Sequence, residues 1–170
     1  MLALVATGVL AVCACSPALD WREVRPEGWS LQASLPCRPA QHARTLTLAG
    51  QPVELGLVVC SAQGHTFAVS SAVMADPVAV GPALQALGEA ARGNLAGQVL
   101  DAQPARVPGM TPQVQALRWR LAGHLPDGQP VQARVLVFAH GLRVFQATVV
   151  GPTTGDAQWQ PFVDGLRLVP

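Results

Sequence analysis

The sequence predicts an α+β fold: a mainly antiparallel sheet of about six to seven strands, covered by one central helix and a short C-terminal helix. Three observations support this prediction. Short β-rich runs alternate with hairpin-type turns, a 3.6-residue apolar pattern interrupts them near mid-chain, and a second helical segment follows the last long run. Because strands joined by hairpins lie antiparallel and each helix must bury its apolar side, the helices are expected to cover the sheet.

The first half of the chain is predicted to consist of strands. Pro26 and Gly28 indicate a turn, and the alternation that follows Trp29 places every second side chain on one face. A hairpin is expected around Gly50, and a further turn around Gly64. The strands expected here are residues 20–25, 29–35, 45–48, 53–60 and 66–71.

The second half begins with the predicted helix. Asp76 and Pro77 are typical of an N-cap and a first helical position, although a second proline leaves a later start at Pro82 open. Apolar residues recur at helical spacing as far as Leu95, and Gly97 is a stop signal. Strand signals return from residue 99, and further strands are expected over 114–122, 131–139 and 142–150. A helix is expected over 155–164, with Trp159, Phe162 and Val163 packed inward. An edge strand over 166–168 is expected to follow.

The first residues predict export. Residues 1–14 carry no charged side chain and would span about 21 Å as a helix, which suits a signal peptide and is too short for a hydrocarbon core of about 30 Å. The usual positive n-region is missing, because Leu2 follows Met1 directly, which suggests a start codon further upstream.

A cysteine follows this apolar run in a setting that resembles a bacterial lipobox: Val12, Cys13 and Ala14 precede Cys15. The resemblance implies a diacylglycerol on the Cys15 thiol, cleavage before this residue and acylation of the new amine. The expected organisation is therefore a lipoprotein signal peptide over residues 1–14, a lipid anchor and short tether over 15–20, and a single domain over 21–170. The alternative is an ordinary signal peptide in which Cys15 is incidental.

Two cysteines remain in the mature chain, Cys37 and Cys60, and each closes a predicted strand. An oxidising periplasm favours a disulfide between them. The alternatives are two separate buried thiols, or a metal site that also uses His65. No CxxC or HxxxH spacing supports a metal, so none is expected.

Three segments form a loose pattern along residues 20–170: Trp21 with Pro26-Glu27-Gly28-Trp29-Ser30-Leu31, Leu35-Pro36-Cys37-Arg38-Pro39, and Phe162-Val163-Asp164-Gly165-Leu166-Arg167-Leu168. This pattern resembles the PsbP/Mog1-like fold group, which includes many small bacterial lipoproteins. The resemblance implies action by contact with other proteins, as in extrinsic photosystem subunits and a small-GTPase partner, and it brings no catalytic residues.

The charges exclude some partners. Eleven basic residues, all arginine, nearly balance ten acidic ones, so nucleic acid is not an expected partner. No hydrolase, metalloprotease or phosphate-loop motif occurs, and no cofactor is expected. The four histidines, His42, His65, His124 and His140, lie near predicted turns and are expected to be solvated.

Two groups of side chains are candidates for contacts. Arg118 and Arg120 share one strand face and can form an anion-binding row with Arg134 and Arg143, or can simply be a solvated face. Among the tryptophans, Trp29 and Trp159 are expected in the core, whereas Trp21, close to the anchor, is a candidate for contact with lipid headgroups.

The sequence therefore predicts a non-catalytic lipoprotein, attached to the membrane by its N-terminal lipid and binding or stabilising a protein partner in the cell envelope. Ser16, which is not Asp, follows Cys15 and implies the outer membrane, facing the periplasm. The alternative is a carrier of a small apolar ligand held between the helix and the sheet. An enzyme with a dispersed site is a third possibility.

Overall fold

The computed structural model describes residues 19–169, and it confirms an α+β fold that is mostly antiparallel and has two helices. The elements are β1 (Arg22–Val24), β2 (Leu31–Leu35), β3 (Ala40–Leu48), β4 (Gln51–Ala62), β5 (His65–Val73), the short 3-10 turn η1 (Pro77–Ala79), α1 (Val80–Asn94), β6 (Gln98–Pro104), β7 (Leu117–His124), β8 (Pro130–His140), β9 (Arg143–Gly151), α2 (Asp156–Asp164) and β10 (Arg167–Leu168).

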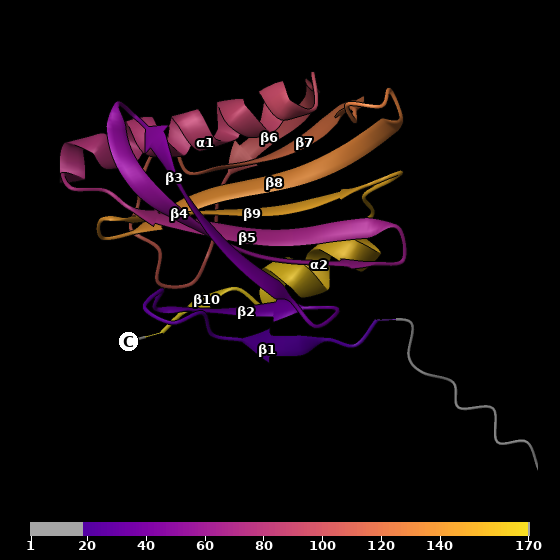
Figure 1. The fold of residues 1–170 in the computed structure, drawn as a ribbon, viewed down its shortest axis with the longest axis horizontal. Coiled ribbons are helices and arrows are strands. Elements are labelled where there is room, and N and C mark those ends of the chain that lie inside the picture. The colour runs from indigo at the N-terminus through magenta and orange to yellow at the C-terminus, as the bar shows by residue number, and fades with distance from the viewer. Residues whose placement is uncertain (1–18, 170) are drawn as a thin grey trace, which may run out of the picture.

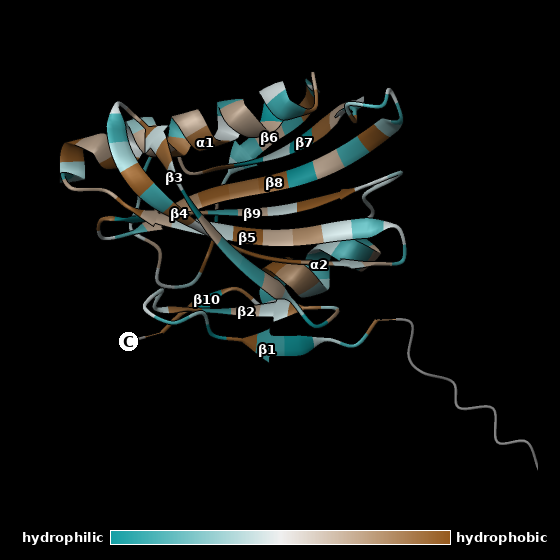
Figure 2. Cartoon of the chain, viewed as in Figure 1, coloured by the Kyte–Doolittle hydropathy of each residue, from teal (hydrophilic) through white to brown (hydrophobic). Residues whose placement is uncertain are grey.

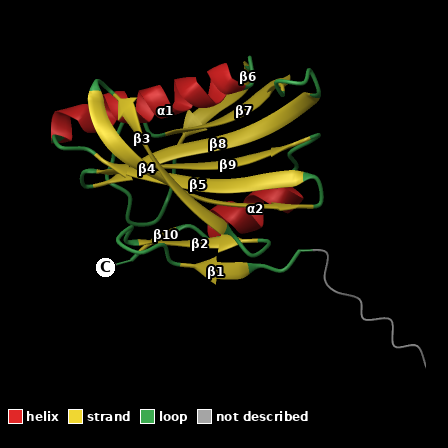
Figure 3. Cartoon of the chain, viewed as in Figure 1, coloured by secondary structure: helices red, strands yellow, loops and turns green. Residues whose placement is uncertain are grey.

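The main sheet has seven strands in the order β3-β4-β5-β9-β8-β7-β6, and every neighbouring pair is antiparallel. β7, β8 and β9 form a meander in which each strand pairs with the next. Helix α1 covers one face of the sheet, whereas α2 and a smaller sheet cover the other (Figures 1 and 3). The domain is therefore built in three layers, with the main sheet in the middle.

The first and last strands do not join the main sheet. β1 and β10 pair with the two sides of β2 and form a separate three-stranded sheet. The prediction of one sheet was incomplete because α2 packs against β2, and β10 then pairs with β2 instead of extending an edge of the main sheet.

Aromatic side chains fill the space between the main sheet and α2. Phe138 and Phe145 stack with their ring centroids 4.9 Å apart, and Phe67 meets Phe162 of α2 edge-on at 5.7 Å. Trp159 packs beside Phe162 and is buried, as predicted. Figure 2 shows the apolar colour concentrated in the central strands of the main sheet, while β1 is largely hydrophilic.

Some predicted boundaries were wrong, and the reasons are local. β2 begins at Leu31, not at Trp29, because Ser30 adopts a left-handed backbone with φ of 48°. β3 begins at Ala40, so His42 lies within a strand and not beside a turn. β7 begins at Leu117, because residues 105–116 form a loop that carries Val114.

The start of the helical region follows the earlier of the two predicted positions. The Asp76 carboxylate accepts a hydrogen bond of 2.8 Å from the Val78 N–H and so caps η1, which runs directly into α1. At the other end, the Gly97 N–H donates to the Arg92 carbonyl at 2.8 Å, which satisfies a terminal acceptor of the helix.

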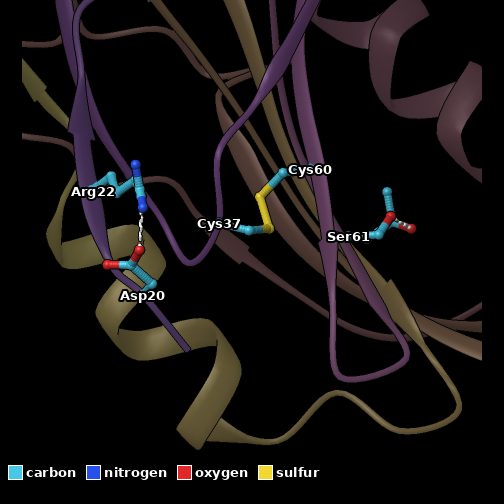
Figure 4. Close-up of a disulfide and its surroundings, with 6 residues drawn as sticks. Asp20, Arg22, Cys37, Cys60 and Ser61 are labelled. Atoms are coloured by element: carbon cyan, nitrogen blue, oxygen red, sulfur yellow. Dashed lines mark hydrogen bonds and ion pairs between the residues drawn. A yellow bond between two sulfur atoms is a disulfide. The ribbon is translucent and has the colours of Figure 1, made fainter. Parts of the chain in front are cut away.

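The predicted disulfide between Cys37 and Cys60 is present, with the two Cα atoms 5.9 Å apart (Figure 4). It ties the β2–β3 connection, and with it the small sheet, to β4 of the main sheet. Asp20, the last residue of the predicted tether, donates its N–H to the Pro36 carbonyl at 2.9 Å and pairs with Arg22. The chain is therefore attached to the domain from residue 20 onward.

Candidate functional site

The lipobox lies outside the described residues, so lipidation of Cys15 stays a prediction, as do the roles of Val12, Cys13 and Ala14. Between residues 19 and 169, no helix is both long and apolar enough to cross a membrane. The sites that the structure can test are all in the α+β domain.

Three of the four arginines in the predicted row come together, and we call this place the arginine pocket. Arg118 and Arg120 extend from β7, and Arg134 extends from β8 directly opposite Arg120. They line a hollow of about 490 Å³, together with Asp101, Gln103, Trp119, Asp156, Trp159 and Gln160. Three of the four arginines of the possible row therefore lie together on one face of the sheet.

Arg134 is held firmly in this pocket. Its Nε donates to the Thr154 carbonyl at 2.9 Å, its Nη1 pairs with Asp156 at 2.7 Å, and its guanidinium carbon lies 6.0 Å from the ring centroid of Trp159. The side chain is only 14% exposed, whereas that of Asp156 is 81% exposed. These contacts fix the Arg134 side chain in place, whereas the side chains of Arg118 and Arg120 are more exposed.

The fourth arginine of the row, Arg143, lies elsewhere. Register places Arg134 opposite Val149 and Arg143 opposite His140, so the two arginines are six residues apart along the strands. This separation corresponds to about 20 Å. Arg143 instead donates to the Ser71 hydroxyl at 3.0 Å, and its partial burial lowers the pKa of its guanidinium.

A second hollow, the helix groove, lies between α1 and the other face of the main sheet. Its floor is a row of register partners, Leu57, Ser70 and Gln146, from three adjacent strands. Leucine and alanine side chains of β3, β4 and α1 form the walls of this space of about 490 Å³, and His42 and Arg44 of β3 also line it. This is the location that the apolar-ligand alternative requires.

A third feature, the loop surface, was missed by the sequence analysis. Residues 104–116 form an open hollow of about 910 Å³ that includes Val107, Met110 and Val114. Val114 also borders a hollow of about 400 Å³ against Val99 and Trp119. Val114 had been assigned to a strand, but the signal for a loop was present in the Pro108-Gly109 turn and in Pro112.

The three side chains of the metal alternative, His65, Cys37 and Cys60, make other contacts. Both ring nitrogens of His65 face backbone carbonyl oxygens, those of Gln63 at 2.9 Å and Thr153 at 2.7 Å. Cys37 and Cys60 are bonded to each other, so the metal alternative with His65 does not form. Across residues 19–169, no three His, Cys, Asp or Glu side chains are grouped as a ligand set.

The tryptophans are placed mainly as packing residues. Trp29 is half-buried and meets Phe145 edge-on at 6.5 Å, and Trp159 is 3% exposed. Trp21 is also half-buried, and its ring lies edge-on to Phe67 at 6.0 Å. Part of the Trp21 ring therefore packs against the core, and contact of its exposed part with lipid headgroups stays a prediction.

Compared with known proteins, the chain matches no protein-family model and none of the curated protein sequences.

Proposed function

We propose that this chain is a lipoprotein of the bacterial cell envelope, anchored through Cys15 to the outer membrane and facing the periplasm. The observation that supports export is the Cys37–Cys60 disulfide, which joins the two sheets. Such structural bridges persist in oxidising compartments and are rare where glutathione keeps thiols reduced. Three acyl chains on the N-terminal cysteine would hold the domain at the membrane almost irreversibly.

Within this proposal, the domain has a PsbP/Mog1-like fold. The mostly antiparallel main sheet and its two helices support this assignment at the level of architecture. The closing segment that carries the sequence resemblance forms the end of α2 and β10. Like the proteins it resembles, the domain acts by contact and has no catalytic role.

The contact is proposed to be with an envelope protein, through the loop surface. One observation supports this choice: Val114 is 86% exposed and lies between two hollows with apolar walls. Apolar side chains gathered at an open surface commonly mark protein contacts. Val99 and Leu100 of the terminal strand β6 are also exposed and extend the apolar character of this edge.

Site-specific photo-crosslinking in the native host tests this contact. A photoreactive amino acid at position 114 should give a discrete protein adduct, and Val114→Arg should remove the same partner from a pull-down. Val78 is the matched control, because it is 82% exposed and belongs to η1, outside both hollows. The proposal is wrong if position 114 gives no discrete adduct, or if positions 78 and 114 give the same one.

The second candidate is a periplasmic carrier of a small apolar ligand, and the helix groove favours it. Leu46, Leu55 and Leu57 are only partly buried there, although they face α1, so apolar surface remains available to a ligand. Burial of an aliphatic chain contributes about 0.8 kcal/mol for each CH₂ group.

Native mass spectrometry of protein purified from its host tests the carrier function. A carrier should show a ligand adduct in the wild type that disappears in Ala90→Trp, which fills the groove with an indole. Gly93→Trp is the control, because Gly93 lies on α1 without lining the groove. Apo protein alone, or an adduct that survives Ala90→Trp, would exclude this function.

A further inference from the structure

Two guanidinium groups of the arginine pocket have no acidic partner among the residues that the structure describes. Arg134 pairs with Asp156, but no carboxylate oxygen lies within 4.0 Å of Arg118 or Arg120. Arg118 instead donates to the amide oxygen of Gln103. The two cations are therefore available to an added anion.

The placement of these cations is unfavourable for stability. Arg120 and Arg134 are direct register partners on neighbouring strands. Like charges directly opposite each other destabilise a sheet, and Asp156 neutralises only the Arg134 side of this pair. An anion bound beside Arg120 would reduce the remaining repulsion.

Asp101 is the acid best placed to neutralise Arg120, since it is the register partner of Arg120 on β6. It does not do so, because the Asp101 carboxylate accepts a hydrogen bond of 3.1 Å from the Gln103 amide. Gln103 thus contacts both Asp101 and Arg118. With Asp101 and Asp156 counted against three arginines, the pocket keeps a net charge of +1.

A smaller hollow of about 310 Å³ continues from the arginine pocket and shares Gln103, Arg118 and Trp159 with it. Its other walls are the apolar side chains Pro104, Leu136 and Val163, with Arg106 as a further cation beside them. A molecule that spans both hollows would therefore present an anionic group to the arginines and a short aliphatic part to this apolar slot.

We propose that the arginine pocket and its apolar slot bind a small organic oxyanion, a phosphate or carboxylate on a short aliphatic chain. Guanidinium groups match such oxyanions because they donate paired hydrogen bonds in a fixed plane. Arg134 provides a fixed wall, and Arg118 and Arg120 close on the anion from β7. This site is separate from the loop surface and does not depend on the proposed protein partner.

The test is an NMR titration of the arginine Nε–Hε signals at constant ionic strength, with inorganic phosphate, butyl phosphate and butyrate as probes. Butyl phosphate and butyrate should each shift the signals of Arg118, Arg120 and Arg134 saturably. Butyl phosphate should bind more tightly than inorganic phosphate, because its chain occupies the apolar slot.

Single variants show whether the binding belongs to this pocket. Arg120→Gln removes an exposed side chain, so the fold should be kept, and the dissociation constant should rise about tenfold. Arg167→Gln is the matched control, an exposed strand arginine on β10 that lines neither the arginine pocket nor the helix groove and makes the same change in net charge. The proposal fails if no probe gives a saturable shift, if butyl phosphate binds no better than inorganic phosphate, or if both variants weaken binding equally.

Discussion

The indole of Trp119 lies against the backbone of Gly88, in the space that a side chain on that residue would occupy. A Cβ built on Gly88 would overlap the Cη2 and Cζ3 atoms of the Trp119 ring. Gly88 is buried in α1, and Trp119 extends from β7, so this contact brings the helix close to the outer part of the sheet. Gly88 has a low intrinsic helix propensity, but its lack of a side chain allows the helix and the Trp119 ring to approach this closely.

Two glycines of α1 should respond in opposite ways to alanine. Gly93 has open space around its Cα, so Gly93→Ala should stabilise the protein by up to about 1 kcal/mol through helix propensity. Gly88→Ala has the same gain in helix propensity, but its methyl group must displace the Trp119 ring. This displacement should lower the free energy of unfolding by about 1 to 3 kcal/mol. Urea unfolding measures the difference, and equal effects at the two positions would contradict the packing.

The disulfide should contribute substantially to stability. Cys37 and Cys60 are 23 positions apart, and a bridge of this span is worth about 3 kcal/mol in the chain-entropy estimate. Reductant should therefore lower the free energy of unfolding of the wild type by this amount. The double variant Cys37→Ala/Cys60→Ala provides the control, since reductant should leave its unfolding curve unchanged. A wild type insensitive to reductant would speak against the bridge.

Removal of the cap on η1 should weaken the helical region. Asp76→Ala deletes the oxygen that accepts the Val78 N–H, which should cost about 1 kcal/mol. Asp76→Asn keeps an oxygen at this position and should cost only a few tenths of that amount. Thermal unfolding of the three proteins gives the ranking, and equal losses in the Asn and Ala variants would show that charge, not capping, matters here.

The position of α2 beneath the main sheet depends on Phe162. This side chain is fully buried and lies between Phe67 and Trp159, so Phe162→Ala should destabilise the domain by about 3 to 5 kcal/mol. Phe162→Leu retains most of the apolar volume and should cost much less. A loss below about 1 kcal/mol in the alanine variant would mean that α2 does not pack as described.

Local signals were sufficient for most of the fold. The turns at Gly50 and Gly64 both have a positive φ at the glycine, and both were predicted from these residues and their neighbours. The pairing of β2 with both β1 and β10 was missed, because it joins residues that are distant in sequence and leaves no local pattern.

The candidate sites also differ in how much of each could be predicted from the sequence. Alternation along β7 put Arg118 and Arg120 on one face, and the structure places Arg134, a third member of the possible row, beside them. The exclusion of Arg143 was available in principle, because the hairpin at Gly141 places Arg143 opposite His140, far along the strand from Arg134. The helix groove and the loop surface depend on how α1 and residues 104–116 pack, which no sequence pattern indicated.

The proposal of an envelope lipoprotein is tested most directly by the intact mass of the protein purified from membranes of its own host. The account predicts a mass equal to residues 15–170 with three acyl chains on Cys15, less two hydrogens for the Cys37–Cys60 bridge. A mass without lipid, or one that retains Met1, would contradict the anchor and remove the basis for a membrane-bound partner.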